Sequence, residues 1–343
     1  ARPGNLDSFQ WEETSATHEV AYAALNFRDV MRAFARLKEI DMSVGLEFSG
    51  YEGQGENRKR VAGIGKKCIG THCNGVFTID LPDNISMEEG ATIPICYLTA
   101  YHALFDKANL QKGDSVLIHA GAGGVGMAAI SICQKRGIEV FTTCSEGKRK
   151  FIKDRFGISD DHIGNSRSAS FKSWLLEKTQ GNGVTAVLNS LAGDLLFASV
   201  ECVSAGGHFC EIGKADIMAN TGLGLRLLER NVSFHVIDLM QLWGIPVVQD
   251  RWKRHIADGF ASGEIVPLPT HTYTPENAKE AFRFMSQGKH LGKVLIDMQD
   301  GVLPKKQDSS PSVRSVEGVK VVTPSIPKKK DDATIVNKYF TKG

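Results

Sequence analysis

The sequence predicts an α/β fold in which a doubly wound parallel sheet is inserted into a second, discontinuous domain rich in β-strands. Short apolar segments alternate with helical segments between residues 115 and 214, and such alternation builds a parallel sheet. A glycine-rich turn joins the first of these strands to the first helix. The residues before 98 read as short strands and turns, and residues 238–298 read as a return to that first domain.

The composition is that of an ordinary soluble globular chain of about two domains. Its 343 residues are 42% hydrophobic and 23% charged, with a formal net charge of +2. This nearly neutral balance does not call for a nucleic acid or a membrane surface as partner. The chain has no apolar run long enough to span a bilayer. It begins without an initiator Met or a signal-peptide core, so we expect it to be cut from a longer protein.

The seven cysteines are odd in number and mostly lie in apolar contexts. They fit a reducing, cytosolic compartment rather than a disulfide framework. Cys68 and Cys73, with His72 between them, are the only cluster that hints at a metal. The closely spaced thiols of a structural zinc site are absent, so we predict no metal.

The first 97 residues are expected to form a small barrel with glycines at its bends. A helix is predicted over residues 28–37, and Ser86 with Glu89 forms a capping box that begins the next helix. The predicted strands are residues 6–11, 20–27, 45–53, 60–64 and 78–82. An apolar helix over residues 94–104 then leads into the parallel sheet, and it carries Thr99, by default a core threonine.

Residues 115–143 form a strand, a glycine turn, a helix from Met127 to about Lys135, and a second strand. This context is required for a dinucleotide site, because backbone N–H groups of the turn must approach a pyrophosphate at the positive end of the helix. We assign the tight turn to Gly121, room for the phosphates to Gly123 and Gly124, and close helix packing to Gly126. The alternative is a loop that merely links strand to helix.

The end of the second strand indicates which nucleotide binds. A site for NAD usually carries an acidic residue here, which holds the ribose hydroxyls. This chain instead has Ser145, Lys148 and Arg149, which can bind a 2′-phosphate, so NADPH is favoured over NADH. Glu146 is the one discordant residue. The alternative is a solvated, charged helix start.

Strand and helix patterns continue to alternate after this point, and ligands in such sheets face the carboxyl ends of the strands. The pairs Asn189–Ser190 and Gly213–Lys214 fall at those ends. The predicted segments are residues 148–156, 161–165, 170–179, 185–189, 195–203 and 207–214. An amphipathic helix over 277–285 and a strand over 293–298 follow, and residues 299–343 read as a linker rich in Asp, Ser, Pro and Lys.

Six motifs in order resemble the enoyl reductase domain of animal fatty acid synthase and of animal synthase-like polyketide synthases. That domain belongs to the zinc-independent quinone oxidoreductase branch of the medium-chain dehydrogenase/reductase superfamily. The motifs are residues 24–31 (ALNFRDVM), 45–50 (GLEFSG), 119–126 (HAGAGGVG), 188–191 (LNSL), 211–214 (EIGK) and 288–294 (GKHLGKV). The resemblance spans about residues 3–298.

The resemblance implies a Rossmann domain over residues 98–237 and a GroES-like barrel formed by 1–97 and 238–298. It implies NADPH-dependent reduction of a trans-2-enoyl chain carried on an acyl carrier protein, with hydride going to the β-carbon and a proton to the α-carbon. Lys214 is the implied proton donor, since an ammonium can also stabilise an enolate. Asp238 is the second catalytic candidate. A structural role, in which its carboxylate accepts hydrogen bonds from backbone N–H groups, is at least as well supported as a catalytic one.

The resemblance further implies a cytoplasmic homodimer that works with other domains of the same synthase. The implied substrate-binding residues are Asn26 and Phe27. The implied cofactor-binding residues are Thr99, Gly121, Ala122, Gly123, Gly124, Val125, Gly126, Ser145, Lys148, Arg149, Asn189, Ser190, Leu191, Ile212, Gly213 and Lys293.

The chain departs from the family pattern at several places. Leu37 stands where many bacterial polyketide reductases carry a Tyr, and Met240 stands at the animal position of the catalytic Asp. Residues 12–19 and 66–77 look shorter than usual, which would trim the substrate barrel. Two alternatives therefore stay open: a catalytically inactive structural domain of a synthase, and a free-standing NADPH quinone reductase.

Overall fold

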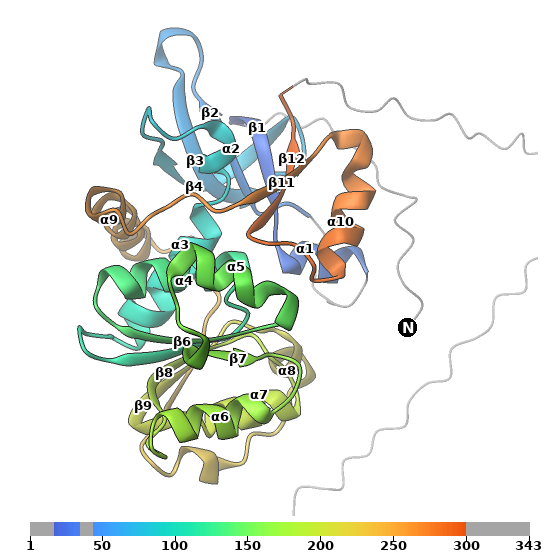
Figure 1. Cartoon of the computed structure of the whole chain (residues 1–343). Helices are drawn as coiled ribbons and strands as arrows, with labels where there is room; N and C mark the ends of the chain where they lie inside the picture. The colour runs from blue at the N-terminus through green and yellow to red at the C-terminus, as the bar shows by residue number, and fades with distance from the viewer. Residues whose placement is uncertain (1–16, 35–43, 300–343) are drawn as a thin grey trace, which may run out of the picture. The chain divides into compact units, whose positions relative to one another are not determined.

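The computed structural model describes residues 17–34 and 44–299, which form two six-stranded sheets connected by helices (Figure 1). The strand predicted over residues 6–11, Leu37 and the linker predicted from residue 300 onward lie outside the described residues. No helix in the described ranges is long and apolar enough to cross a bilayer.

The first sheet contains strands from both ends of the chain, as the predicted fold class requires. Its order is β11-β12-β1-β2-β3-β4, antiparallel except for the parallel pair β11–β12. The strands are β1 (His18–Leu25), β2 (Glu47–Glu52), β3 (Lys59–Lys66), β4 (His72–Asp80), β11 (Thr270–Tyr273) and β12 (Lys293–Asp297). β1 also pairs with β4, with His18 opposite Cys73. Strands β1 to β4 therefore form a closed ring, and the short stretch over residues 66–77 does not open it.

The second sheet is entirely parallel, in the order β10-β9-β8-β5-β6-β7. Its strands are β5 (Ser115–Ile118), β6 (Glu139–Cys144), β7 (Ile163–Asn165), β8 (Val184–Asn189), β9 (Val203–Glu211) and β10 (Ser233–Val236). The chain order reverses at β5, which lies between β6 and β8. Ligands of such sheets bind at this switch point. The predicted fold class is confirmed.

The helices connect the strands and cover the sheets. They are α1 (Phe27–Ala33), α2 (Met87–Gly90), α3 (Pro94–Tyr101), α4 (Gly124–Lys135), α5 (Glu146–Phe156), α6 (Ser170–Lys178), α7 (Asp194–Val200), α8 (Ala215–Ala219), α9 (Pro246–Ser262) and α10 (Ala278–Ser286). A π-helical turn, η3 (His102–Lys107), extends α3. The 3₁₀ turns are η2 (Gly55–Asn57), η4 (Asp160–His162), η5 (Leu225–Leu228), η6 (Leu239–Gln241) and η7 (Pro275–Asn277). The predicted capping box before α2 is present, with Glu89 N–H donating to Ser86 Oγ at 3.1 Å.

One continuous apolar core joins the two sheets through α3. It contains Ile64 of β3, Tyr97 and Tyr101 of α3, and Ile118 of β5, all at most 2% exposed. Trp252 of α9 is fully buried in the same cluster. This packing holds the carboxyl edge of the parallel sheet next to the first sheet. The domain boundaries at residues 97, 237 and 298 stay predictions.

Candidate active site

The turn after β5 exposes the N-terminus of α4 at the switch point. Gly123 N–H donates to the Ala120 carbonyl at 2.8 Å and closes the turn. Helix α4 then begins at Gly124, three residues before the predicted start, and its N-cap Gly123 provides no side-chain cap. The first N–H groups of a helix have no partner within the helix, so this terminus can bind an anion.

The structure shows a different reason for the glycine at position 121 than the tight turn that was predicted. The left-handed backbone conformation of the turn falls on Ala120, with φ of 55°. Gly121 is instead required by close packing, because an added Cβ would lie 2.1 Å from Thr142 Oγ1 of β6. A Cβ at Gly126 would lie 2.4 Å from the Ala120 carbonyl oxygen, which agrees with the predicted close packing of the helix.

Gly123 and Gly124 were both predicted to make room for phosphates, but they differ in what surrounds them. A Cβ at Gly123 would meet one atom, the Ala120 carbonyl oxygen, at 3.2 Å, which is a tight contact. A Cβ at Gly124 would lie 2.6 Å from Cys96 Sγ and 3.2 Å from Lys293 Cδ. Gly124 therefore allows α4 to pack against α3 and β12.

The loop before β12 joins the glycine turn to the predicted 2′-phosphate residues. Gly292 N–H donates to the Ala122 carbonyl at 3.2 Å, and Gly292 forms an isolated bridge with Gly123. Lys148 Nζ donates to the carbonyls of Gly288 at 2.8 Å and His290 at 2.6 Å. Burial and the neighbouring positive charge of Arg167 lower the pKa of Lys148.

The other two predicted phosphate residues lie on the same helix. Ser145 is the N-cap of α5, and its side chain makes no capping hydrogen bond. The Arg149 guanidinium lies 3.2 Å from Asp160 Oδ1 and 3.5 Å from Glu146 Oε2. Arg149 is thus already paired with two carboxylates, and one of them is the discordant Glu146.

The two predicted catalytic residues form an ion pair at the carboxyl ends of neighbouring parallel strands. Lys214 follows β9 and Asp238 follows β10, and the register places Glu211 opposite Val236. Lys214 Nζ lies 2.6 Å from Asp238 Oδ2, and the side chains are 24% and 25% exposed. Asp238 Oδ1 also accepts a hydrogen bond from the Met240 N–H at 3.1 Å, so its predicted structural role is present as well.

A buried carboxyl group lies at the end of β9, three residues before Lys214. Glu211 is 1% exposed and accepts hydrogen bonds from the Asn189 amide and the Gly213 N–H. Burial raises the pKa of Glu211 to about 7, against the lowering effect of these hydrogen bonds. The Asn189 amide also donates to the Leu191 carbonyl at 2.9 Å, and Ile212 N–H donates to the Asn189 carbonyl at 2.9 Å. Glu211 thereby fixes both strand ends relative to each other.

A second Lys–carboxylate pair lies inside the molecule beside the glycine turn. Lys293 Nζ lies 2.6 Å from Glu47 Oε2, and the side chains are 4% and 0% exposed. Asn26 donates to Glu47 Oε2 at 3.2 Å and accepts from Lys293 Nζ at 3.0 Å, while Ile95 N–H of α3 donates to Glu47 Oε1 at 2.7 Å. Burial lowers the pKa of Lys293, but the attraction of Cys96, Glu47 and Asp29 raises it on balance.

Sequence reasoning missed Glu47 and Glu211 as parts of the site. Glu47 stands between Leu46 and Phe48, and Glu211 stands between Cys210 and Ile212. An acidic residue between two apolar neighbours could have revealed them, since a buried carboxylate needs partners. The remaining predicted residues differ in exposure: Thr99 of α3 is 8% exposed and Phe27 is 57% exposed.

Among the residues that the structure describes, no group of three or more His, Cys, Asp or Glu side chains could hold a metal ion. Cys68 and Cys73 are neighbours in the core, and burial raises the pKa of the Cys68 thiol.

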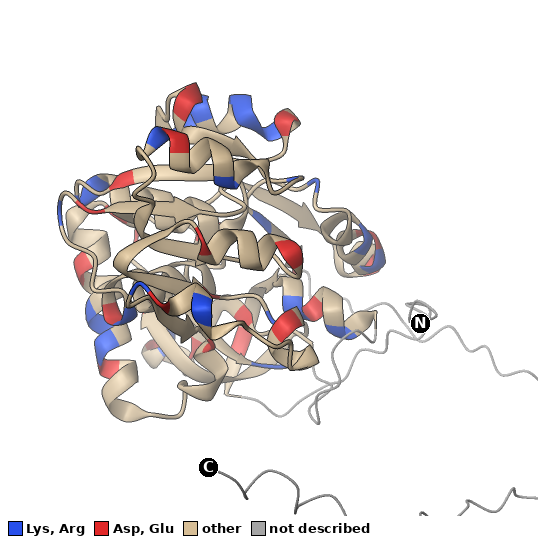
Figure 2. Cartoon of the chain, turned by 90° about the horizontal axis from the view of Figure 1, so that it is seen from below, with Lys and Arg blue, Asp and Glu red and all other residues tan. Residues whose placement is uncertain are grey.

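Lys and Arg are interspersed with Asp and Glu in the view of Figure 2.

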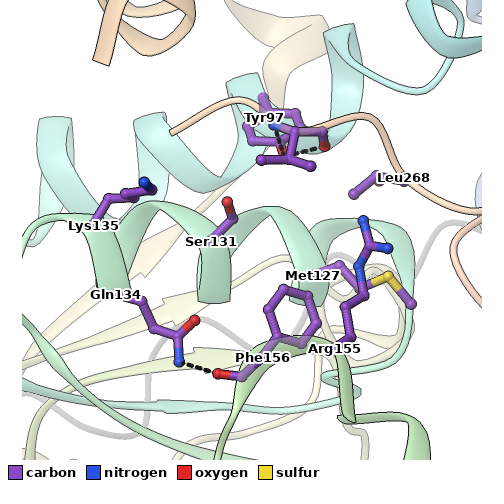
Figure 3. Close-up of a pocket in the computed structure, with 9 residues that line it drawn as sticks. Tyr97, Met127, Ser131, Gln134, Lys135, Arg155, Phe156 and Leu268 are labelled. Atoms are coloured by element: carbon purple, nitrogen blue, oxygen red, sulfur yellow. Dashed lines mark hydrogen bonds between the residues drawn. The ribbon is translucent and has the colours of Figure 1, made fainter. Parts of the chain in front are cut away.

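A pocket of about 390 Å³ lies away from these residues, between α4, the end of α5 and the segment at Val266 and Leu268 (Figure 3). Gln134 and Arg155 line it, and the Gln134 amide donates to the Phe156 carbonyl at 2.8 Å. It contains none of the predicted site residues.

Comparisons with known proteins agree with this geometry. A family model described as zinc-binding dehydrogenase matches residues 159–296. The chain is 36% identical over 318 residues to a phenolphthiocerol/phthiocerol polyketide synthase polypeptide of Mycobacterium tuberculosis, covering 87% of this chain and 14% of the synthase polypeptide. It is 37% identical over 332 residues to a compactin diketide synthase of Penicillium citrinum, covering 88% of this chain and 13% of that synthase.

The chain therefore spans about one seventh of the length of the first of these relatives. Among solved structures, the CurK enoyl reductase superposes with a TM-score of 0.73 at 30% identity. That superposition covers 84% of this chain and 93% of the CurK chain.

Proposed function

The chain belongs to the enoyl reductases of polyketide synthases within the medium-chain dehydrogenase/reductase superfamily, and from this membership we propose that it reduces 2-enoyl thioesters with NADPH. The observation that carries the proposal is the Lys214–Asp238 ion pair at 2.6 Å, at the same sheet edge as the glycine turn. The reduction requires a site for the dinucleotide and a group that can donate a proton. The glycine turn and the Lys214 ammonium, which lie at the same edge of the sheet, can provide them.

The glycine turn fits a dinucleotide. Gly123 has no side chain that could cap the helix, and the first N–H groups of α4 have no partner within the helix. Ser145 and Lys148 lie at the end of the neighbouring strand and can hold a 2′-phosphate. Glu146, which would repel that phosphate, lies 3.5 Å from the Arg149 guanidinium, and this positive charge offsets part of the repulsion. When bound, NADPH supplies the hydride that the β-carbon of the enoyl group accepts.

Lys214 has two tasks in this chemistry. Its ammonium stabilises the negative charge that develops on the thioester oxygen of the substrate as an enolate forms. It then donates a proton to the α-carbon, which restores the thioester carbonyl and leaves the side chain as a neutral amine. Asp238 holds the ammonium in place, and the Met240 N–H in turn holds Asp238.

The natural substrate in this proposal is a trans-2-enoyl chain on an acyl carrier protein domain, delivered within a larger synthase. The relatives named above are synthases of which this chain matches 14% and 13% of the length, and this supports other synthase domains as partners. Homodimerisation and a parent that is an animal fatty acid synthase or an animal synthase-like polyketide synthase belong to the same proposal, and they depend on the motif resemblance. A cytoplasmic location belongs to it as well, supported by the odd number of cysteines in apolar contexts.

The proposal is tested by incubating the 343-residue chain with NADPH and crotonyl thioester and following the loss of NADPH. We expect NADPH oxidation that depends on the thioester and a product saturated at the α and β carbons. NADPH binding without turnover would indicate an inactive structural domain. Turnover with a quinone but not with the thioester would indicate a quinone reductase.

A further inference from the structure

The pocket in Figure 3 combines an apolar wall with two exposed cations. Its volume is about 390 Å³, which lies within the range of small-molecule sites. Met127 and Tyr97 in its wall are fully buried, and Leu268 is 4% exposed. Lys135 from the last turn of α4 and Arg155 from the last turn of α5 also line it. This lining suits a molecule that is apolar along its body and negatively charged at one end.

The neutral polar groups of the pocket already have partners within the protein. The Ser131 hydroxyl donates to the Glu264 carbonyl at 2.8 Å, and the Gln134 amide donates to a backbone carbonyl. The Tyr97 hydroxyl donates to the Val266 carbonyl at 2.6 Å and accepts from the Val266 N–H at 2.9 Å. A ligand therefore depends mainly on the two cations for its polar contacts.

The two cations have no acidic partner. Within residues 17–34 and 44–299, no carboxylate forms an ion pair with Lys135 or Arg155. Asp154, which precedes Arg155, pairs with a lysine of its own helix at 2.6 Å. The carboxylate of Glu264, whose carbonyl meets Ser131, is held by Arg136 at 2.9 Å. The positive charge beside the pocket is thus available to an anion.

Arg155 is held beside the pocket without using all of its donors. Its Nη2 donates to the Pro267 carbonyl at 3.0 Å, and its guanidinium lies 5.6 Å from the centre of the Phe156 ring. A guanidinium has five N–H donors, so others remain for a ligand. In the view of Figure 3, Ser131 lies between Lys135 and Arg155.

We propose that this pocket binds an apolar carboxylic acid in its ionised form. The apolar chain packs against Met127, Tyr97 and Leu268, where each methylene removed from water favours binding about fourfold. The carboxylate meets the positive charge of Lys135 and Arg155. The ligand differs from the enoyl thioester of the proposed reaction, which has no carboxylate, so the inference stands independently of that reaction.

The test measures dissociation constants by isothermal titration calorimetry with octanoate, 1-octanol and acetate as probes. Octanoate has both the chain and the charge, and each of the other probes has only one of them. The double variant Lys135→Gln/Arg155→Gln is compared with the unaltered 343-residue chain. The control Lys150→Gln/Lys153→Gln removes the same amount of charge from exposed positions on α5.

We expect octanoate to bind the pocket variant about tenfold or more weakly than the unaltered chain, the effect of losing a charge-assisted interaction. The control variant should bind octanoate as the unaltered chain does. Octanol should bind the unaltered chain and both variants equally, and acetate should bind at least about tenfold more weakly than octanoate. Lys214→Ala should bind octanoate as before, because Lys214 does not line this pocket.

Four results would overturn the inference. The first is that octanoate does not bind the unaltered chain, and the second is that octanol binds it as tightly as octanoate. The third is a loss of octanoate affinity in Lys214→Ala but not in the pocket variant, which would place the ligand at the carboxyl edge of the parallel sheet. The fourth is a lower free energy of urea unfolding in the pocket variant with unchanged octanoate affinity, which would mean that the two cations only stabilise helix ends.

Discussion

Two Lys–carboxylate pairs in this molecule have the same length and opposite surroundings. Lys293–Glu47 and Lys214–Asp238 both join at 2.6 Å. The first pair is 4% and 0% exposed and receives additional hydrogen bonds from Asn26 and Ile95. The second is 24% and 25% exposed, and its additional hydrogen bond comes from the Met240 N–H to Asp238.

The difference shows how surroundings decide what an ion pair does. A fully buried pair is enclosed by its own partners, so it holds structure together and cannot meet a substrate. The Lys293–Glu47 pair joins β12, β2 and the start of α3 beside the first residue of α4. The half-buried pair keeps an ammonium accessible at the sheet edge, and we assign the chemistry to that pair.

The largest effect is expected when the accessible pair is broken. Lys214→Ala should lower kcat for enoyl thioester reduction by about 10² to 10⁴, the usual contribution of a general acid. The free energy of unfolding should change by only about 1 kcal/mol or less, because the pair is partly solvated. Steady-state kinetics and urea unfolding measure the two quantities. An unchanged kcat would remove Lys214 from the chemistry.

Breaking the buried pair should act on stability instead. Lys293→Met leaves Glu47 as a buried charge without its cation, and the expected loss is about 3 to 5 kcal/mol in the free energy of unfolding. Urea unfolding measures the loss. Lys150→Met is the control, since Lys150 is 87% exposed in its pair with Asp154, and it should cost about 0.5 kcal/mol or less. If Glu47→Gln does not restore part of the stability in the Lys293→Met background, the buried charge is not the cause.

Glu211 is as buried as Glu47, but it accepts its hydrogen bonds from neutral groups rather than from a cation. It therefore shows what burial does to a carboxyl group that has no ammonium beside it. Its pKa is raised from 4.5 to about 7, so the folded chain binds the proton more tightly than the unfolded chain. The contribution of this group to the free energy of unfolding is therefore fully present below pH 4.5. It is lost as the pH rises from 4.5 to 7, and the total loss is up to about 3 kcal/mol. Glu211→Gln should flatten unfolding free energies measured between these pH values. An unchanged slope in the variant would contradict this assignment.

The smallest effect is expected at Asp238. Asp238→Asn keeps the acceptor for the Met240 N–H and still reaches Lys214, but it removes the negative charge that orients the ammonium. We expect kcat to fall by about tenfold, as for the loss of one charge-assisted interaction, with little change in the affinity for NADPH. A fall as large as that of Lys214→Ala would mean that Asp238 takes part in proton transfer itself.

Local patterns in the sequence were sufficient for the fold class and for the residues at the carboxyl edge of the parallel sheet. The alternation of short strands and helices predicted the parallel sheet, and the glycines after residue 120 predicted the turn at its switch point. The strand-end motifs containing Asn189 and Lys214 predicted which residues lie at the carboxyl edge. These features depend on spacing along the chain, because backbone geometry repeats over a few residues.

Only the tertiary structure decided which charges are paired. Lys293 meets Glu47 across 246 residues, and Arg149 meets Asp160 beyond its own helix as well as Glu146 within it. The left-handed residue of the turn is Ala120 rather than Gly121. Gly121 instead leaves room for the side chain of Thr142. An electrostatic partner is set by distance and burial in space, and neither quantity is written in the local order of residues.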